Sequence, residues 1–183
     1  MKFKTLKTVV AVILVEIVLL AAIALIVIRT GVYNVAATEP HRDLTNRVLS
    51  TMMDNSVRRQ ASGIELSPSF STPDLDVGFE HYQAMCVACH GAPGMKKSEV
   101  GEGLNPPAPN LSDTAADLSP QVVFWVLKNG IKMTGMPAFG PTHDDETLWN
   151  LTAFVKGLPA MTPDEYREMA EEAGDREPSN HQH

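Results

Sequence analysis

Cysteine is scarce in this chain of 183 residues, which has only two, Cys86 and Cys89. Two cysteines are too few for a disulfide-stapled scaffold or for a four-cysteine zinc or iron–sulfur site. The sequence also has no internal repeat and no glycine-rich phosphate-binding loop. Its length allows one ordinary domain with extensions, which excludes a large multidomain enzyme. Whatever chemistry the two cysteines perform, they perform it together.

Basic residues are outnumbered by acidic ones, and the formal net charge is −7. A nucleic-acid-binding protein would need a basic stripe to neutralise phosphates, so this function is excluded. The imbalance is uneven along the chain. Residues 1–70 hold 8 Lys and Arg against 5 Asp and Glu, net +3, while residues 71–183 hold 7 against 17, net −10. We expect the basic half to lie near lipid and the acidic half to face water.

Long apolar runs are limited to one, Val9 to Ile28, which is interrupted only by Glu16. At about 1.5 Å of rise per residue it spans roughly 30 Å, the thickness of the hydrocarbon core of a bilayer. A cleaved signal peptide is the alternative, since lysines precede the run and Val35-Ala36-Ala37 resembles a cleavage site. Cleaved apolar segments are shorter, at about 7–15 residues. Residues 1–30 are therefore predicted to form a transmembrane anchor that crosses the membrane once.

The charges that flank this run predict its orientation. Lys2, Lys4 and Lys7 precede it, and Arg29 alone follows it closely. Positive residues favour the cytoplasmic side, so we expect the rest of the chain on the periplasmic side of the inner membrane. Glu16 lies within the span, where a carboxylate is costly. It is either a neutral acid tolerated in a single anchor or a contact with a partner transmembrane helix.

Residues 31–73 are predicted to connect this anchor to a globular domain that begins at about Asp74. Between residues 38 and 63, arginines lie among apolar residues near helical spacing, which predicts an amphipathic helix against lipid headgroups or against the domain. The stretch from Ser67 to Pro73 is rich in turn residues and is predicted to be a linker. Residues 161–183 are predicted to form a polar, disordered C-terminal tail. The apolar positions of the amphipathic helix are Leu44, Val48, Met52 and Val57.

The two cysteines lie in the sequence Cys86-Val87-Ala88-Cys89-His90, which has the form C-x-x-C-H. This motif is typical of c-type haem attachment, in which two thiols add to the vinyl groups of haem and the adjacent histidine binds iron from one face. A redox-active C-x-x-C pair needs a βαβ context, which the surrounding sequence lacks. Two inert buried thiols, or a different metal, are the other interpretations. The spacing and the histidine together favour haem c.

Three helices are predicted between residues 74 and 160, with no strand pattern among them. The first runs from Phe79 to Cys86. The second has Ser119 as a favourable N-cap, followed by Pro120, and ends at Gly130. The third begins near the acidic residues 144–146, which suit the positive end of a helix dipole, and ends near residue 157. A domain of roughly 90 residues has a thin core, so we expect the flat, apolar haem to complete it.

A wider set of residues surrounds the motif: Gly78, Tyr82, Pro109-Asn110-Leu111, the segment from Gly135 to Gly140 and the aromatic residues of the third helix. Together with the C-x-x-C-H motif, they resemble the class I c-type cytochromes over residues 74–160. The resemblance implies an all-α domain of three to four short helices around one haem, preceded here by a transmembrane helix. In that family the first and last helices cross at a small residue, which implies that Gly78 and Tyr82 contact Trp149 and Phe154.

The resemblance also implies which residues hold haem. Cys86 and Cys89 would form the covalent thioethers. His90 would bind iron on one face, and the carbonyl group of Pro109 would orient its ring through the other ring nitrogen. A methionine suits the opposite face in an electron-transfer protein, because its soft thioether favours ferrous iron. Met136 matches the family's Met-Pro pattern.

Two other methionines compete with Met136 for the iron. Met133 lies three residues earlier in the same loop, and Met95 follows the attachment motif too closely to reach around haem easily. Four histidines are predicted not to bind iron: His81 and His143 at the surface, and His181 and His183 in the tail.

With both axial positions filled, the implied function is one-electron transfer without catalysis. A membrane-tethered carrier would pass electrons between redox proteins, such as a membrane dehydrogenase, a quinol-oxidising complex or a terminal oxidase, or would serve as the cytochrome subunit of one of them. The acidic balance of residues 71–183 favours a basic redox partner. The alternative is a haem enzyme or gas sensor with a displaceable sixth ligand, which requires Met136 to be absent from iron.

Overall fold

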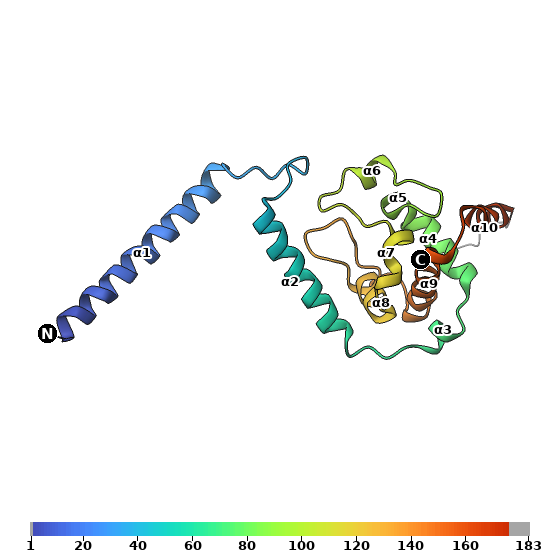
Figure 1. The fold of residues 1–183 in the computed structure, drawn as a ribbon, viewed down its shortest axis with the longest axis horizontal. Coiled ribbons are helices and arrows are strands. Elements are labelled where there is room, and N and C mark those ends of the chain that lie inside the picture. Colours follow the sequence, from blue (N-terminus) through green and yellow to red (C-terminus); the bar gives the residue numbers. More distant parts are fainter. Residues whose placement is uncertain (1, 176–183) are drawn as a thin grey trace. The chain divides into compact units, whose positions relative to one another are not determined.

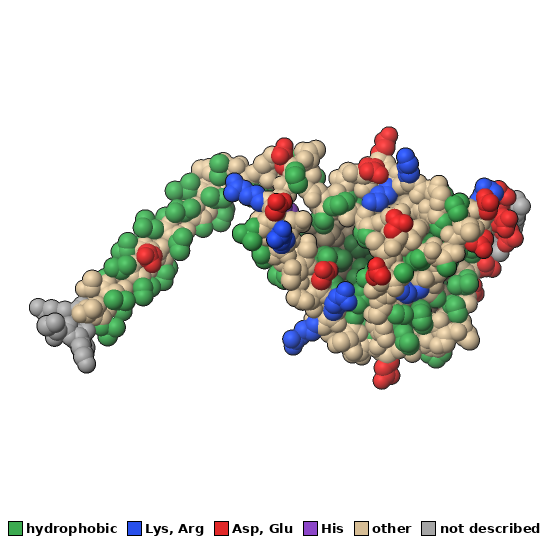
Figure 2. All heavy atoms as spheres, viewed as in Figure 1, with side chains coloured by type: hydrophobic (Ala, Val, Ile, Leu, Met, Phe, Trp, Pro, Cys, Tyr) green, Lys and Arg blue, Asp and Glu red, His purple; other side chains and the backbone are tan. Residues whose placement is uncertain are grey.

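The computed structural model describes residues 2–175 and divides the chain into two compact units, with the boundary between residues 39 and 40. The first unit contains α1 (Lys2–Thr30). Its large apolar side chains are exposed, and Figure 2 shows them along the helix. The segment Thr5–Thr30 is long and apolar enough to cross a membrane, which agrees with the predicted single span. The histidines predicted in the tail, His181 and His183, lie outside the described residues.

The second unit is helical, and its described residues contain no strand, which confirms the predicted all-α fold. Its longer helices are α2 (Asp43–Ala61), α4 (Leu75–Met85), α8 (Pro120–Asn129), α9 (Asp145–Gly157) and α10 (Pro163–Asp175) (Figure 1). Single helical turns lie between them: α3 (Pro68–Ser71), α5 (Val87–His90), α6 (Glu99–Glu102) and α7 (Leu111–Thr114), with 3-10 turns η1 (Ala115–Asp117) and η2 (Leu158–Ala160). The three helices predicted between residues 74 and 160 correspond to α4, α8 and α9.

Side-chain caps begin α8 and α9, and a glycine ends α8. Ser119 accepts a hydrogen bond from the backbone N–H of Val122 and caps α8, and Asp144 accepts one from Thr147 and caps α9. Pro120 occupies the first turn of α8, where its missing N–H costs nothing. Gly130 follows α8 with a positive φ of 64°. The start and end predicted for α8 are therefore confirmed.

The core forms where α4 crosses α9. A Cβ atom on Gly78 would lie 2.7 Å from both the Asn150 carbonyl oxygen and the Phe154 Cβ, so only glycine allows this close approach. One turn further along α4, the ring of Tyr82 packs on that of Phe154, with centroids 5.4 Å apart. Trp149 instead stacks on Phe124 of α8 at 4.1 Å. The expected contacts with Phe154 are confirmed, while Trp149 joins α9 to α8.

Helix α2 packs on this domain through its C-terminal half. Val57 and Ala61 are buried against Val122 of α8. The predicted linker after α2 is also packed, because Phe70 of α3 contacts the ring of Trp149 edge to face at 5.8 Å. Residues 64–73 are thus part of the second unit. The N-terminal half of α2 keeps its large apolar side chains exposed: Leu44, Val48, Leu49 and Met52.

The chain from residue 163 to 175 differs from the predicted polar tail, because it forms α10. Tyr166 is 1% exposed, and its ring lies 5.4 Å from that of Phe79. Its hydroxyl donates a hydrogen bond to the side-chain oxygen of Gln83 at 2.5 Å. Acidic residues dominate the composition of this segment, yet its apolar residues recur on one helical face. The polar composition therefore obscured an amphipathic helix that packs on the domain.

Candidate functional site

The cysteine pair lies where α4 ends and α5 begins. Cys86 caps both helices, and its carbonyl oxygen accepts hydrogen bonds from Cys89 and His90 at 3.1 and 2.9 Å. Residues three apart on a helical turn share a face, so the two thiols lie side by side. Neither cysteine forms a disulfide. Burial raises the pKa of the Cys86 thiol to about 12, with a smaller contribution from Cys89, so this thiol is uncharged at neutral pH.

The chain after the motif is held firmly against α5. The Tyr82 hydroxyl donates to the Gly91 carbonyl oxygen at 2.6 Å. Ser98 donates to the Ala88 carbonyl oxygen through both its backbone N–H and its hydroxyl, each at 2.9 Å. Gly91 has a φ of 71°, and a Cβ there would lie 2.8 Å from a backbone oxygen. The motif therefore lies on a rigid support.

The ring of His90 is fixed by a backbone contact. Its Nδ1 lies 2.8 Å from the carbonyl oxygen of Pro109, and because a carbonyl can only accept, Nδ1 carries the proton. In the neutral ring the lone pair then lies on Nε2, which is left available to a metal. Burial lowers the pKa of His90, the Pro109 contact acts in the opposite direction, and Lys97 lowers it further. The environment thus favours the neutral, metal-binding form.

Met136 lies in the loop between α8 and α9. Its backbone N–H donates to the Thr134 hydroxyl at 3.1 Å, and its carbonyl accepts from Ile131 at 3.2 Å. The loop turns back on itself at Gly130, where a Cβ would lie 2.7 Å from backbone atoms of Pro137 and Ala138. Met136 is half-buried and packs on the core. This loop is therefore held in one shape.

All five residues predicted for the haem site line one cavity of about 370 Å³. Cys86, Cys89 and His90 approach it from the α4–α5 corner, while Met136 approaches from the α8–α9 loop. Pro109 completes the set. Figure 2 shows hydrophobic side chains around a hollow on this face of the domain. Apolar side chains make up most of the remaining wall: Met85, Leu104, Leu111, Leu118, Val123, Val126, Leu127, Ile131, Phe139 and Val155.

The other residues weighed as iron ligands in the sequence analysis lie outside this cavity within the described residues. Met133 has a positive φ of 60° and its side chain is 97% exposed, while Met95 is 47% exposed. The rings of His81 and His143 pack on each other with centroids 5.2 Å apart, and neither lines the cavity. Geometry therefore separates Met136 from the two methionines that competed with it.

Part of the cavity wall comes from a segment that the sequence analysis did not assign to the site. Met53, Asp54, Val57 and Arg58 of α2 all line the cavity. The sequence carried one signal, the apolar face that includes Val57, but it could not identify what this face would cover.

The cavity fits haem c in its chemistry. A flat macrocycle needs apolar walls, covalent attachment needs two thiols on one side, and iron needs soft or imidazole donors. Two adjacent thiols, an imidazole with a defined tautomer and a thioether surround one apolar space. Within the described residues, no cluster of three or more His, Cys, Asp or Glu offers an alternative metal site.

Comparison with known proteins leads to the same cofactor. Residues 73–155 match the family model described as cytochrome c oxidase, cbb3-type, subunit III. Over 96 residues the chain is 31% identical to a protein of Thauera butanivorans named 1-butanol dehydrogenase (cytochrome c). That match covers 52% of this chain and 12% of the relative, and no solved structure matches the chain. Residues 73–155 therefore form a c-type cytochrome domain, an electron-transfer domain that carries covalently bound haem c.

Proposed function

We propose that this chain is a membrane-anchored one-electron carrier in which His90 and Met136 bind the two faces of one haem iron. Cys86 and Cys89 are the attachment residues in this proposal. The observation that carries it is that an imidazole and a thioether, supplied by elements far apart in the sequence, line the same apolar cavity. When bound, haem c supplies an iron centre that alternates between the ferric and ferrous states.

The residues around the two ligands have distinct tasks. The Pro109 carbonyl holds the His90 ring by its Nδ1 proton, which directs Nε2 into the cavity and raises its basicity as a ligand. On the opposite side, the Thr134 hydroxyl fixes the backbone of Met136 and itself donates to the Ile131 carbonyl at 2.8 Å. A thioether held in this way resists replacement by water or by a gas.

The apolar wall keeps water out. Val123, Leu127 and Phe139 line the cavity, and the first two are buried in the domain core. A dry, low-dielectric setting disfavours the more highly charged ferric state and raises the reduction potential. Rigid ligands and excluded water also reduce the rearrangement that accompanies electron transfer. These properties suit a carrier better than an enzyme that must admit a substrate to iron.

Replacement of Met136 by alanine tests the iron ligand. We expect M136A to lose the sixth ligand, so that its reduced form binds carbon monoxide readily, its visible spectrum changes and its reduction potential falls. The wild-type protein should bind carbon monoxide slowly or not at all. M133A is the matched control, because Met133 is exposed and lies in the same loop; its spectrum and potential should stay at the wild-type values.

The same measurement separates the carrier from the alternative function. Rapid carbon monoxide binding by the wild-type protein would contradict six-coordination by methionine and favour a haem enzyme or gas sensor. An unchanged spectrum and potential in M136A would show that Met136 is not the ligand.

Redox proteins in or on the same membrane are the proposed partners. The relative from Thauera is named as a cytochrome c-linked dehydrogenase, and the matching family model describes an oxidase subunit. Both names suit a carrier that links a membrane dehydrogenase or quinol-oxidising complex to a terminal oxidase, or a fixed subunit of such a complex. The candidate span Thr5–Thr30 supports an inner-membrane anchor. Lysines such as Lys7 lie before the apolar run and favour a cytoplasmic N-terminus, which would place the haem domain on the periplasmic side.

A further inference from the structure

Helix α2 takes part in the haem cavity although it precedes the matched cytochrome domain. The family match begins at residue 73, whereas α2 ends at Ala61. Val57 is buried at the contact with Val122 of α8, and it also lines the cavity. Val57 and Ala61 hold α2 against the domain. As a result Met53 and Asp54, one turn before Val57, and the adjacent Arg58 lie at the cavity wall. The wall that α2 provides is therefore an addition to the domain itself.

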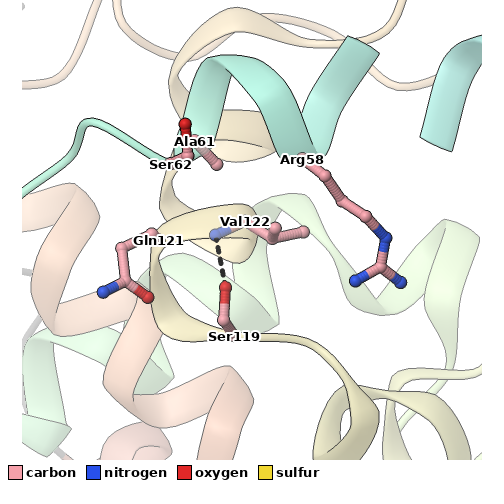
Figure 3. Close-up of a pocket in the computed structure, with 6 residues that line it drawn as sticks. All are labelled: Arg58, Ala61, Ser62, Ser119, Gln121 and Val122. Carbon is pink, nitrogen blue, oxygen red and sulfur yellow. Dashed lines mark hydrogen bonds between the residues drawn. The ribbon is translucent and has the colours of Figure 1, made fainter. Parts of the chain in front are cut away.

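Arg58 is unusual among the described residues that line the cavity, because it is the only Lys or Arg. Its guanidinium group forms no ion pair and no hydrogen bond with a described residue. In Figure 3 the guanidinium group lies apart from the Ser119 hydroxyl and the Gln121 amide, which belong to the neighbouring end of α8. Arg58 is exposed. A solvated cation at the edge of an apolar cavity, without a protein partner, is available to bind an anionic group of the cofactor.

Three lysines of this unit, by contrast, have protein partners. Lys97 donates to the carbonyl oxygen of Ala108. Lys128 pairs with Asp145 at 2.6 Å, and Lys156 donates to the Leu118 carbonyl oxygen at 2.5 Å. None of these three lysines lines the cavity. The acidic side chain on the α2 wall, Asp54, would repel a carboxylate, so Arg58 is the group that would attract one.

Haem presents carboxylates of this kind. Its propionate groups are ionised at neutral pH and cannot be buried against apolar walls without a cation or water. An arginine binds a carboxylate through two parallel N–H···O hydrogen bonds, a geometry that lysine cannot match. The polar edge of the cavity formed by Asp54 and Arg58 is thus the side toward which a propionate would be directed.

We propose that Arg58 binds a haem propionate and that α2 thereby forms part of the haem site. This inference rests on the proposed function, because it requires haem in the cavity between His90 and Met136. The contact would favour the ferrous state by adding a positive charge near iron. It would also tie the segment before the cytochrome domain to the cofactor.

The test compares R58Q with R59Q in the full-length haem-loaded protein. The two changes remove the same charge from adjacent positions of α2, but Arg59 does not line the cavity. We expect R58Q to lower the reduction potential clearly more than R59Q does, and to shift the propionate bending band in the resonance Raman spectrum. R58K should retain most of the potential, since the charge remains, but should still shift that band. Equal potentials in R58Q and R59Q, with an unchanged band, would overturn the inference.

Two further readouts keep this test separate from the proposed function. Covalent haem content and resistance to carbon monoxide should stay at wild-type values in R58Q, because they depend on the cysteines and on the axial ligands. If the wild-type protein itself bound carbon monoxide readily, the axial assignment would fail, whatever the potential of R58Q. Hydrogen exchange across α2 shows whether the helix is still docked; undocking in R58Q but not in R58K supports the contact, and undocking in both contradicts it.

Discussion

Gly78 sets the distance between α4 and α9, the two helices that carry the attachment motif and the aromatic core. The 2.7 Å that a Cβ would leave to Asn150 and Phe154 is shorter than real Cβ contacts allow. Any side chain at this position would push the helices apart. Tyr82 lies on α4 with Gly78, and Cys86 ends this helix. A shift of α4 would therefore also displace the haem-attachment motif.

Replacement of Gly78 by alanine is therefore expected to destabilise the protein by about 1–3 kcal/mol, the usual cost of overpacking. Gly157, at the end of α9, is a matched control because a Cβ there would meet nothing within 4 Å. G157A should be neutral or slightly stabilising. Denaturant unfolding of the full chain in detergent, followed by circular dichroism, measures both. Equal midpoints for the two variants would show that the helices adjust freely at Gly78.

Sequence patterns predict single residues well where the cause is local. Ser119 was identifiable as a cap because capping depends on a side chain and an N–H two or three residues away, and the start of α9 was identifiable from the acidic residues 144–146. The motif at residues 86–90 was identifiable for a similar reason. All five predicted site residues lie at one cavity, but their bonds to haem and iron stay predictions until the variants are measured.

At the scale of elements, α10 illustrates what the sequence concealed. Its polar composition suggested a tail, whereas Tyr166 is inserted among Phe79 and Tyr82. Composition averages over all faces of a helix, but docking depends on one face alone. The cavity wall from α2 escaped prediction for a related reason: periodicity marks an apolar face without identifying its partner.

Truncation of Tyr166 to alanine is expected to cost about 3–5 kcal/mol, as for other large buried aromatic side chains. The change removes ring contacts in the core and the hydrogen bond to Gln83. E168A, on the exposed side of the same helix, should stay within about 0.5 kcal/mol of wild type. Thermal and denaturant unfolding give both values. A loss no larger than that of E168A would mean that α10 does not stabilise the domain.

At the scale of the whole molecule, charge is distributed unevenly, with net −10 over residues 71–183 and net +3 before them. Long-range fields of this kind act on the rate of encounter more than on affinity. Arg58 of α2 lines the haem cavity, so its charge opposes the acidic balance locally. A redox partner is therefore attracted or repelled according to whether it approaches the acidic surface or the cavity edge at Arg58.

We expect the acidic surface to dominate the exchange of electrons with small reagents. Reduction of the oxidised protein by hexaammineruthenium(II), a cation, should slow several-fold as ionic strength rises from about 0.01 to 1 M, because the Debye length falls from about 30 to 3 Å. Oxidation of the reduced protein by hexacyanoferrate(III), an anion, should accelerate over the same range. Stopped-flow absorbance measures both rates. The opposite pair of trends would indicate that local positive charge, such as that of Arg58, governs access to haem.

Because residues 64–73 are packed into the second unit, the segment left to act as a tether between α1 and α2 is residues 31–42. Fully extended, that segment spans about 40 Å. With α1 as the proposed anchor, the cytochrome explores a thin layer of solvent above the bilayer, where its effective concentration toward a membrane partner is in the millimolar range. A partner whose redox centre lies farther from the membrane than this layer is out of reach. In this proposal, the length of residues 31–42 therefore limits the cytochrome to partners whose redox centres lie close to the membrane.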